Sequence, residues 1–256
     1  MPVIAVINRK GGSGKSTTAA HLAAWLAGCG VSVMLGDVDR QQSARAWLGR
    51  RDPTLPVIKP WAVDQNRVLK APGGVTHVVL DTQGGLHGFE LAKLVMNCDA
   101  ILMPVCNSIF DRDSALACYE ELQTLPRVAS GRCRIGAFGM RVDARTKGAE
   151  SLREWAAAAG IPFLGVLRET QLYVRSLEAG MTIFDLPGAL TKADRQQWEP
   201  ILQWLNPLLL TAVPQAPELE SAPEAARPSI PASMLSRFLQ EQRAARSAAR
   251  EPHYLN

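Results

Sequence analysis

The feature that most limits how this chain folds is an alternation of short apolar runs with longer segments of helical composition. The runs are rich in Val, Ile and Leu and cover residues 3–8, 31–37, 76–81, 100–105, 134–140 and 163–167. Near-continuous apolar runs of this length are typical of strands buried on both faces. Because parallel strands are joined by helical crossovers, the alternation predicts an α/β fold: a doubly wound, mostly parallel sheet with helices on both faces. Ligands bind such sheets at the carboxyl ends of the strands.

The composition predicts one α/β domain followed by two smaller segments. The chain has 256 residues, 47% of them hydrophobic, which suffices for one substantial core and an appendage. Residues 1–211 contain all the predicted strands, and residues 212–231 form a Pro/Ala/Glu-rich linker interrupted by prolines. Residues 232–256 are predicted to form a short amphipathic helix whose apolar residues are Met234, Leu235, Phe238 and Leu239.

The charge of the chain bears on its binding partners, and its cysteine content and N-terminus bear on its location. The formal charge is +4, and five arginines balance five glutamates beyond residue 211, so the whole excess lies in residues 1–211. Such a modest excess is compatible with a polyanionic partner. The five cysteines include no C-x-x-C pair, and the N-terminus enters a strand-like run without a signal sequence. We therefore predict reduced cysteines and a cytoplasmic location.

A glycine-rich loop between the first predicted strand and the helix after it indicates phosphate binding. Residues 7–18 read INRKGGSGKSTT. Glycines here let backbone N–H groups turn inward around an anion, and the following helix adds the positive end of its dipole. Lys15 is expected to pair with the β- and γ-phosphates, and the Ser16 hydroxyl to bind Mg²⁺. The predicted nucleotide-binding residues are Gly11, Gly12, Ser13, Gly14, Lys15, Ser16 and Thr17.

The loop departs from the ordinary G-x-x-x-x-G-K-[ST] pattern, because Arg9 stands where the first glycine is expected and Lys10 follows it. Lys10 lies on the opening limb, so its side chain is expected to project away from the phosphate cradle. The segment RKGGSGKS resembles the ParA/MinD family of ATPases, whose loop has the form x-K-G-G-x-G-K-[ST]. The resemblance implies that Lys10 reaches the ATP of a second copy in a face-to-face dimer. The alternative, a solvated charge, stays open.

Three aspartates at strand ends complete the predicted catalytic centre. The segment GDVDRQQ resembles the family's D-x-D-P-Q, which implies Asp37 near Mg²⁺ and Asp39 holding the attacking water; Arg40 stands where the family has proline. The segment THVVLDTQGG has the form of a Walker B strand that brings Asp81 to Mg²⁺ through water, with two glycines next to the γ-phosphate. An acidic solvent turn at Asp37 and Asp39 is the alternative.

The implied reaction is ATP hydrolysis by water, and the predicted catalytic residues are Lys10, Lys15 and Asp39. No strong general base is apparent in the pattern, so slow intrinsic turnover is expected. A dimer with ATP and a monomer with ADP have different affinities for other ligands, which is what a nucleotide switch requires.

A cation-rich segment after the fifth predicted strand, RVDARTK, indicates a DNA-binding surface. In ParA proteins the arginine of D-A-R-T belongs to a basic surface formed across the dimer, which binds DNA without reading its sequence. Each neutralised phosphate releases counterions, so doubling a small patch by dimerisation matters. Gln171 stands where the family has another arginine, and dispersed solubility charges remain the alternative. The predicted contacts are Arg141, Arg145, Lys147, Arg168 and Arg175.

The C-terminal segment supports a rival hypothesis. MinD-like proteins bind membranes through a short amphipathic C-terminal helix, and residues 233–250 combine apolar residues with four arginines. The apolar face is short, so we favour docking on a protein over a membrane, and docking on the parent domain is equally open.

The sequence therefore predicts a ParA-like, nucleoid-associated ATPase that dimerises with ATP, binds DNA nonspecifically and positions a plasmid, chromosome or protein cluster. A cargo-linked partner protein would release it by stimulating hydrolysis. A membrane-surface ATPase resembling MinD is the alternative. A metal-cluster carrier of the same superfamily is disfavoured because a cysteine pair is missing.

Overall fold

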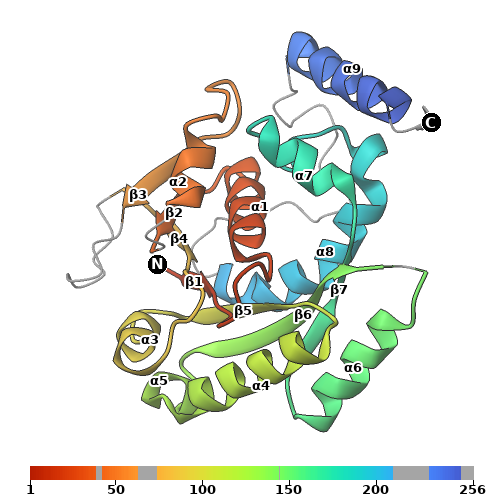
Figure 1. The fold of residues 1–256 in the computed structure, drawn as a ribbon. Helices are drawn as coiled ribbons and strands as arrows, with labels where there is room; N and C mark the ends of the chain where they lie inside the picture. The colour runs from red at the N-terminus through yellow and green to blue at the C-terminus, as the bar shows by residue number, and fades with distance from the viewer. Residues whose placement is uncertain (39–41, 63–73, 144, 210–230, 249–256) are drawn as a thin grey trace.

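The computed structural model describes residues 1–38, 42–62, 74–143, 145–209 and 231–248 (Figure 1). Within these residues, seven parallel strands form one sheet in the order β3-β2-β4-β1-β5-β6-β7. The predicted doubly wound parallel sheet is thereby confirmed. The strands are β1 (Val3–Val6), β2 (Val33–Asp37), β3 (Ile58–Ala62), β4 (His77–Asp81), β5 (Ala100–Val105), β6 (Arg134–Val142) and β7 (Phe163–Arg168).

Helices cover both faces of the sheet. One face packs against α1 (Lys15–Gly28), α2 (Ser43–Leu48), α7 (Gln171–Glu178) and α8 (Gly188–Leu209). The other packs against α3 (Gly88–Val95), α4 (Ile109–Thr124), α5 (Pro126–Ala129) and α6 (Gly148–Ala158). Figure 1 shows α4 and α6 on the opposite side of the sheet from α1. A final helix, α9 (Ala232–Ala248), lies beside α7.

The central strand β1 shows why the sequence forms a sheet buried on both sides. Ile4 and Val6 join the core beneath α1, whereas Ala5 and Ile7 join the core beneath α3 and α4. Successive strand residues point to opposite faces, so an uninterrupted apolar run fills both cores. The loop after β1 consequently begins at the middle of the sheet, with β4 on one side and β5 on the other.

The sequence pattern did not reveal β3, which is the edge strand beside β2. Its sequence, IKPWA, contains Pro60, which has no backbone N–H to donate to a neighbouring strand. Proline is tolerated on an edge strand, where one side of the strand has no partner, but it weakens the strand signal in the sequence.

The C-terminal helix packs on the parent domain. Phe238 is 3% exposed and joins an apolar cluster with Leu55, Met181 and Leu186. Four more side chains of this cluster are partly buried: Leu172, Ala179, Met234 and Leu239. The sequence left three binding partners open for this segment: another protein, a membrane and the parent domain. In the structure the helix packs on the parent domain. The predicted linker, apart from Pro231, lies outside the described residues.

Within the described part of the chain, no helix combines the length and the apolar character needed to cross a membrane.

Replacing Phe238 with Asp should release α9 from the domain. Burial of a Phe side chain is worth roughly 1.5–3 kcal/mol, and an unpaired carboxylate in its place adds a desolvation cost. We expect amide hydrogen exchange in residues 232–240 to become at least about tenfold faster. Ser236→Asp, at an exposed position on the same helix, is the control and should leave exchange unchanged. Equal exchange in Phe238→Asp and the wild type would contradict the observed packing.

Candidate nucleotide-binding site

Hydrogen bonds to both neighbouring strands fix the start of the glycine loop. Asn8 follows β1; its side-chain amide donates to the carbonyl of Pro104 on β5 at 2.7 Å, and its side-chain oxygen accepts from the N–H of Lys10 at 3.0 Å. On the other side, the Thr82 hydroxyl after β4 donates to the Val6 carbonyl at 2.7 Å. The loop therefore leaves the sheet in a direction set by buried polar contacts.

Two glycines in the loop have backbone conformations that favour glycine. Gly12 has φ 72° and Gly14 has φ 94°, both in the left-handed region. Gly14 also lies against Met140 at the end of β6, where an added Cβ would come within 2.8 Å of Met140 Cγ. After Gly14 the chain enters α1, and the Thr18 N–H and hydroxyl both bond the Gly14 carbonyl at 2.9 Å.

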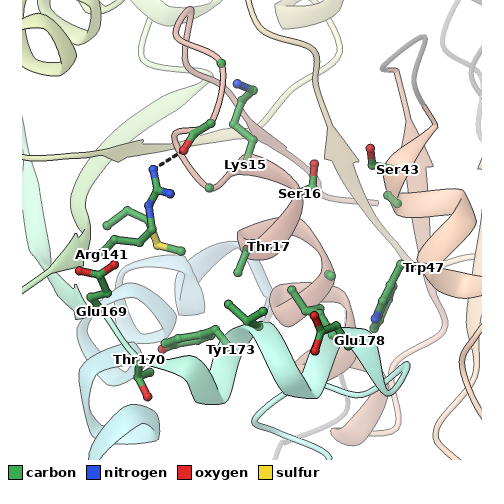
Figure 2. Close-up of a pocket in the computed structure, with 18 of the residues that line it drawn as sticks. Lys15, Ser16, Thr17, Ser43, Trp47, Arg141, Glu169, Thr170, Tyr173 and Glu178 are labelled. Atoms are coloured by element: carbon green, nitrogen blue, oxygen red, sulfur yellow. Dashed lines mark hydrogen bonds between the residues drawn. The ribbon is translucent and has the colours of Figure 1, made fainter. Parts of the chain in front are cut away.

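The loop opens onto a pocket of about 800 Å³ (Figure 2). The glycine loop and the start of α1 form one wall, and α7 lies across from them. α2 contributes Ser43 and Trp47 to the lining, the turn between β7 and α7 contributes Glu169 and Thr170, and α7 contributes Tyr173. The pocket lies at the carboxyl ends of the strands, where doubly wound sheets bind ligands.

Lys15 supplies a cation suited to an anion. Lys15 is 7% exposed, and its Nζ donates to the Lys10 carbonyl at 2.9 Å, so the side chain spans the loop. It lines the pocket together with Gly12 and Gly14. The Ser13 hydroxyl is buried without a hydrogen-bond partner in the structure, and Ser13 is not among the residues that line the pocket.

The two predicted metal-binding carboxylates that the structure describes lie side by side. Asp37 and Asp81 are register partners at the ends of β2 and β4, and they are 3% and 0% exposed. One Asp37 oxygen also accepts from the Arg45 N–H at 3.1 Å. Asp39 lies outside the described residues.

The oxygen donors present fit Mg²⁺. Among the described residues there is no cluster of three or more His, Cys, Asp or Glu side chains suited to a metal. Asp37 and Asp81 supply two adjacent carboxylates, and Ser16 in the pocket lining supplies a hydroxyl, so the donors available here are hard oxygens. Mg²⁺ is usually bound by such a set together with water and substrate phosphates, so the site suits a metal that arrives with a nucleotide.

The turn after β4 touches the glycine loop. The Gly85 N–H donates to the Arg9 carbonyl at 2.6 Å. A Cβ added to Gly84 would lie 3.2 Å from the Gly11 nitrogen and 3.3 Å from the Arg9 carbonyl oxygen. Glycine at position 84 therefore allows the two loops to approach closely, next to the pocket that both line.

The two cations that open the loop both pair with α4. Lys10 Nζ lies 2.7 Å from Asp111 Oδ1, and the Arg9 guanidinium pairs with Glu121. Partial burial raises the pKa of Asp111, but hydrogen bonds from Lys10 and Ser108 outweigh this effect, so its pKa lies below the usual value. Lys10 therefore points away from the pocket of its own chain, as its place on the opening limb predicted.

The structure separates the cations that the sequence grouped as DNA contacts. Arg141 and Arg168 line the nucleotide pocket, and Arg168 forms a bidentate ion pair with the buried Asp194 at 2.8 and 2.9 Å. Arg175 is half-buried on α7. Arg145 and Lys147 are exposed in the turn after β6.

The wall formed by α2 and α7 was not predicted from the sequence. Trp47 is 5% exposed and packs in the core, yet it also lines the pocket with Tyr173. One signal was available: Thr170 follows β7 and caps α7, its hydroxyl accepting from the Leu172 N–H at 3.2 Å. A capping residue directly after a strand marks a strand–helix turn at the ligand-binding edge.

The chain matches the CobQ/CobB/MinD/ParA nucleotide binding domain family (CbiA) over residues 4–183. It is 32% identical over 190 residues to Maintenance of carboxysome distribution protein A of Gloeobacter kilaueensis, covering 73% of this chain and 85% of that protein. A shorter match, 54% identical over 48 residues, joins it to the chromosome-partitioning ATPase Soj of Thermus thermophilus and covers 19% of each protein.

Solved structures share the fold. The ATP complex of a Cyanothece McdA variant has a TM-score of 0.60 at 15% identity, covering 84% of this chain and 99% of that one. MinD of Aquifex aeolicus has a TM-score of 0.63 at 16% identity, with the same coverage. With its glycine loop, paired carboxylates and family match in agreement, the chain belongs to the MinD/ParA family of P-loop ATPases.

Proposed function

We propose that this protein is a ParA-like ATPase that positions or segregates a cargo by cycling between an ATP-bound dimer on DNA and an ADP-bound monomer. The observation that carries the proposal is the orientation of two lysines. Lys15 spans its own loop, whereas Lys10 is directed outward to α4. One lysine thus serves the nucleotide of its own chain, and the other is available to a second copy. Residues 1–211 would form the ATPase domain and residues 232–256 a docking segment.

The chemistry assigned to the pocket is electrostatic. Lys15 and the loop N–H groups would hold the phosphates, and Ser16, Asp37 and Asp81 would hold Mg²⁺, whose chemistry when bound is to neutralise phosphate charge. Asp39 orients the attacking water. Because this set contains no strong general base, hydrolysis is slow until a cargo-linked activator protein binds. The slow rate sets how long the ATP-bound state lasts.

Relatives support the positioning role. The named function of the Gloeobacter kilaueensis relative is carboxysome distribution, and that of the Thermus thermophilus relative is chromosome partitioning. For this chain we propose ATP-dependent placement of a cargo in the cytoplasm over the nucleoid. The membrane alternative needs the apolar face of α9, which here packs on the domain through Phe238.

Nucleotide-dependent dimerisation tests the proposal. We expect an Asp39→Ala variant, which slows hydrolysis, to form a stable dimer with ATP and a monomer with ADP in size-exclusion chromatography with multi-angle light scattering. Adding Lys10→Ala should abolish the difference, because the second copy then loses its cation at the phosphates. Lys192→Ala, at an exposed position on α8, is the matched control. An Asp39→Ala protein that stays monomeric with ATP would refute the dimer model.

The ion pair with Asp111 should oppose dimerisation, because Lys10 has to leave α4 before it reaches a second copy. Lys10 is 37% exposed at its side chain, so the pair is screened and contributes only about 0.2–1 kcal/mol. We expect Asp111→Asn to lower the ATP concentration for half-maximal dimerisation by about two- to fivefold.

The control for this change is Asp113→Asn, an exposed position on the same helix. It should leave the ATP requirement unchanged. If Asp111→Asn instead raised the requirement, Asp111 would stabilise the dimer, and its role as a restraint on Lys10 would be wrong.

DNA binding should depend on Arg145. Its side chain is 89% exposed, and its ion pair with Asp143 is therefore weak enough to exchange for a phosphate. We expect Arg145→Ala to weaken ATP-dependent binding to DNA of any sequence and to reduce the salt dependence by about one counterion per protomer, measured by fluorescence anisotropy. The control is Arg132→Ala, an exposed position just before β6, at the opposite end of this strand from Arg145. Equal loss in both variants would point to diffuse charge instead of a defined surface.

A further inference from the structure

The last residues of β6 hold the glycine loop from the side of the pocket. Met140 lies against Gly14, as described above, and the next residue, Arg141, donates from Nη2 to the carbonyl of Gly12. Figure 2 shows this hydrogen bond between the loop and the Arg141 side chain at the edge of the pocket. The same Nη2 lies 3.3 Å from Cys106 Sγ, after β5. Two consecutive side chains of one strand therefore contact two of the loop's glycines.

Arg141 has an uncommon backbone conformation. Its φ is 55°, and among the described residues only Gln42 shares a positive φ without being glycine. The left-handed region places the Cβ of an L-residue close to the following carbonyl, so the conformation is unfavourable for arginine. Such strained residues gather at functional sites, where the surrounding structure keeps them in place. This observation is independent of the hydrogen bond and marks the same residue.

The bond from Arg141 restricts one peptide plane of the loop. In a planar trans peptide the C=O and the following N–H point in opposite directions, so a fixed Gly12 carbonyl also fixes the direction of the Ser13 N–H. Gly12 itself, with φ 72°, has no side chain to limit its rotation. Phosphate binding by such loops depends on N–H groups that already point to the anion. An anchored carbonyl lowers the entropy lost when the nucleotide binds.

We propose that Arg141 is a positioning residue of the nucleotide-binding loop: its guanidinium holds the Gly12 carbonyl so that the loop amides are preorganised for phosphates. Its effect is on nucleotide affinity, for ADP and ATP alike, and hydrolysis by the bound complex does not depend on it. This assignment replaces the DNA contact predicted from the sequence for Arg141. It rests on nucleotide binding in this pocket and is independent of dimerisation and DNA binding.

Isothermal titration of the full-length chain with Mg²⁺–ADP and Mg²⁺–ATPγS tests the inference. We expect Arg141→Asn to weaken both affinities by about tenfold or more, the loss usual for a hydrogen bond to a charged group. Asparagine tolerates the left-handed region, so the melting temperature should not fall. The kcat at saturating ATP should stay within about twofold while KM rises. Arg141→Lys keeps a cationic donor and should recover part of the affinity.

Controls separate positioning from strain and general charge. Gln42→Asn changes the other non-glycine residue with positive φ among the described residues, and Arg153→Asn removes an exposed cation on α6; both should bind ADP like the wild type. If Arg141→Asn does not fold, Arg141→Gly gives the same test without backbone strain.

Unchanged ADP affinity in Arg141→Asn, or a fall in kcat with affinity intact, would overturn the inference. Equal losses in Arg141→Asn and Arg153→Asn would overturn it too. A wild type that fails to bind either nucleotide would refute the proposed function itself, so the two failures are distinguishable.

Discussion

The hydrogen bonds at the end of β1 are the constraint on which the site depends. Asn8 and Thr82 tie the first strand to β5 and β4 just where the glycine loop leaves the sheet. Both side chains are about 99% buried, so these bonds compete little with water. The loop can therefore contain flexible glycines and still start from a fixed point, and Lys15 and the paired carboxylates of β2 and β4 are placed relative to that point.

The exchange of a glycine for Arg9 has a physical explanation in the pairing with α4. A loop that presents two cations outward needs acidic partners, or their charges repel each other and Lys15. Glu121 and Asp111 supply these partners from one helix, on the face of the sheet opposite α1. The partly exposed pair at Lys10 is weak enough to break, which is what a residue shared between two chains requires.

The sequence predicted the fold, the loop and the carboxylates because each depends on local spacing: apolar runs, glycines before a helix, and Asp37 and Asp81 at strand ends. It failed where neighbours in space are distant in the chain. Trp47 and Tyr173 are brought to the same pocket by the fold alone. Arg141 and Arg145 are close in sequence, yet the positive φ at Arg141 directs its side chain to the loop while Arg145 stays in solvent. The edge strand β3 was not predicted, because Pro60 weakens its strand signal in the sequence.

A buried ion pair and close backbone packing join the two segments that form the wall the sequence missed. Arg51, after α2, and Asp185, after α7, form a bidentate ion pair at 2.7 and 2.9 Å with both side chains at most 5% exposed. Such a pair gains little net stability after desolvation, but its geometry permits one arrangement of the two segments. Gly180 packs so closely on the Arg50 carbonyl that a Cβ would lie 2.3 Å from it. The same two segments carry Leu55 and Met181, so the cluster that receives Phe238 and the wall of the nucleotide pocket share one framework.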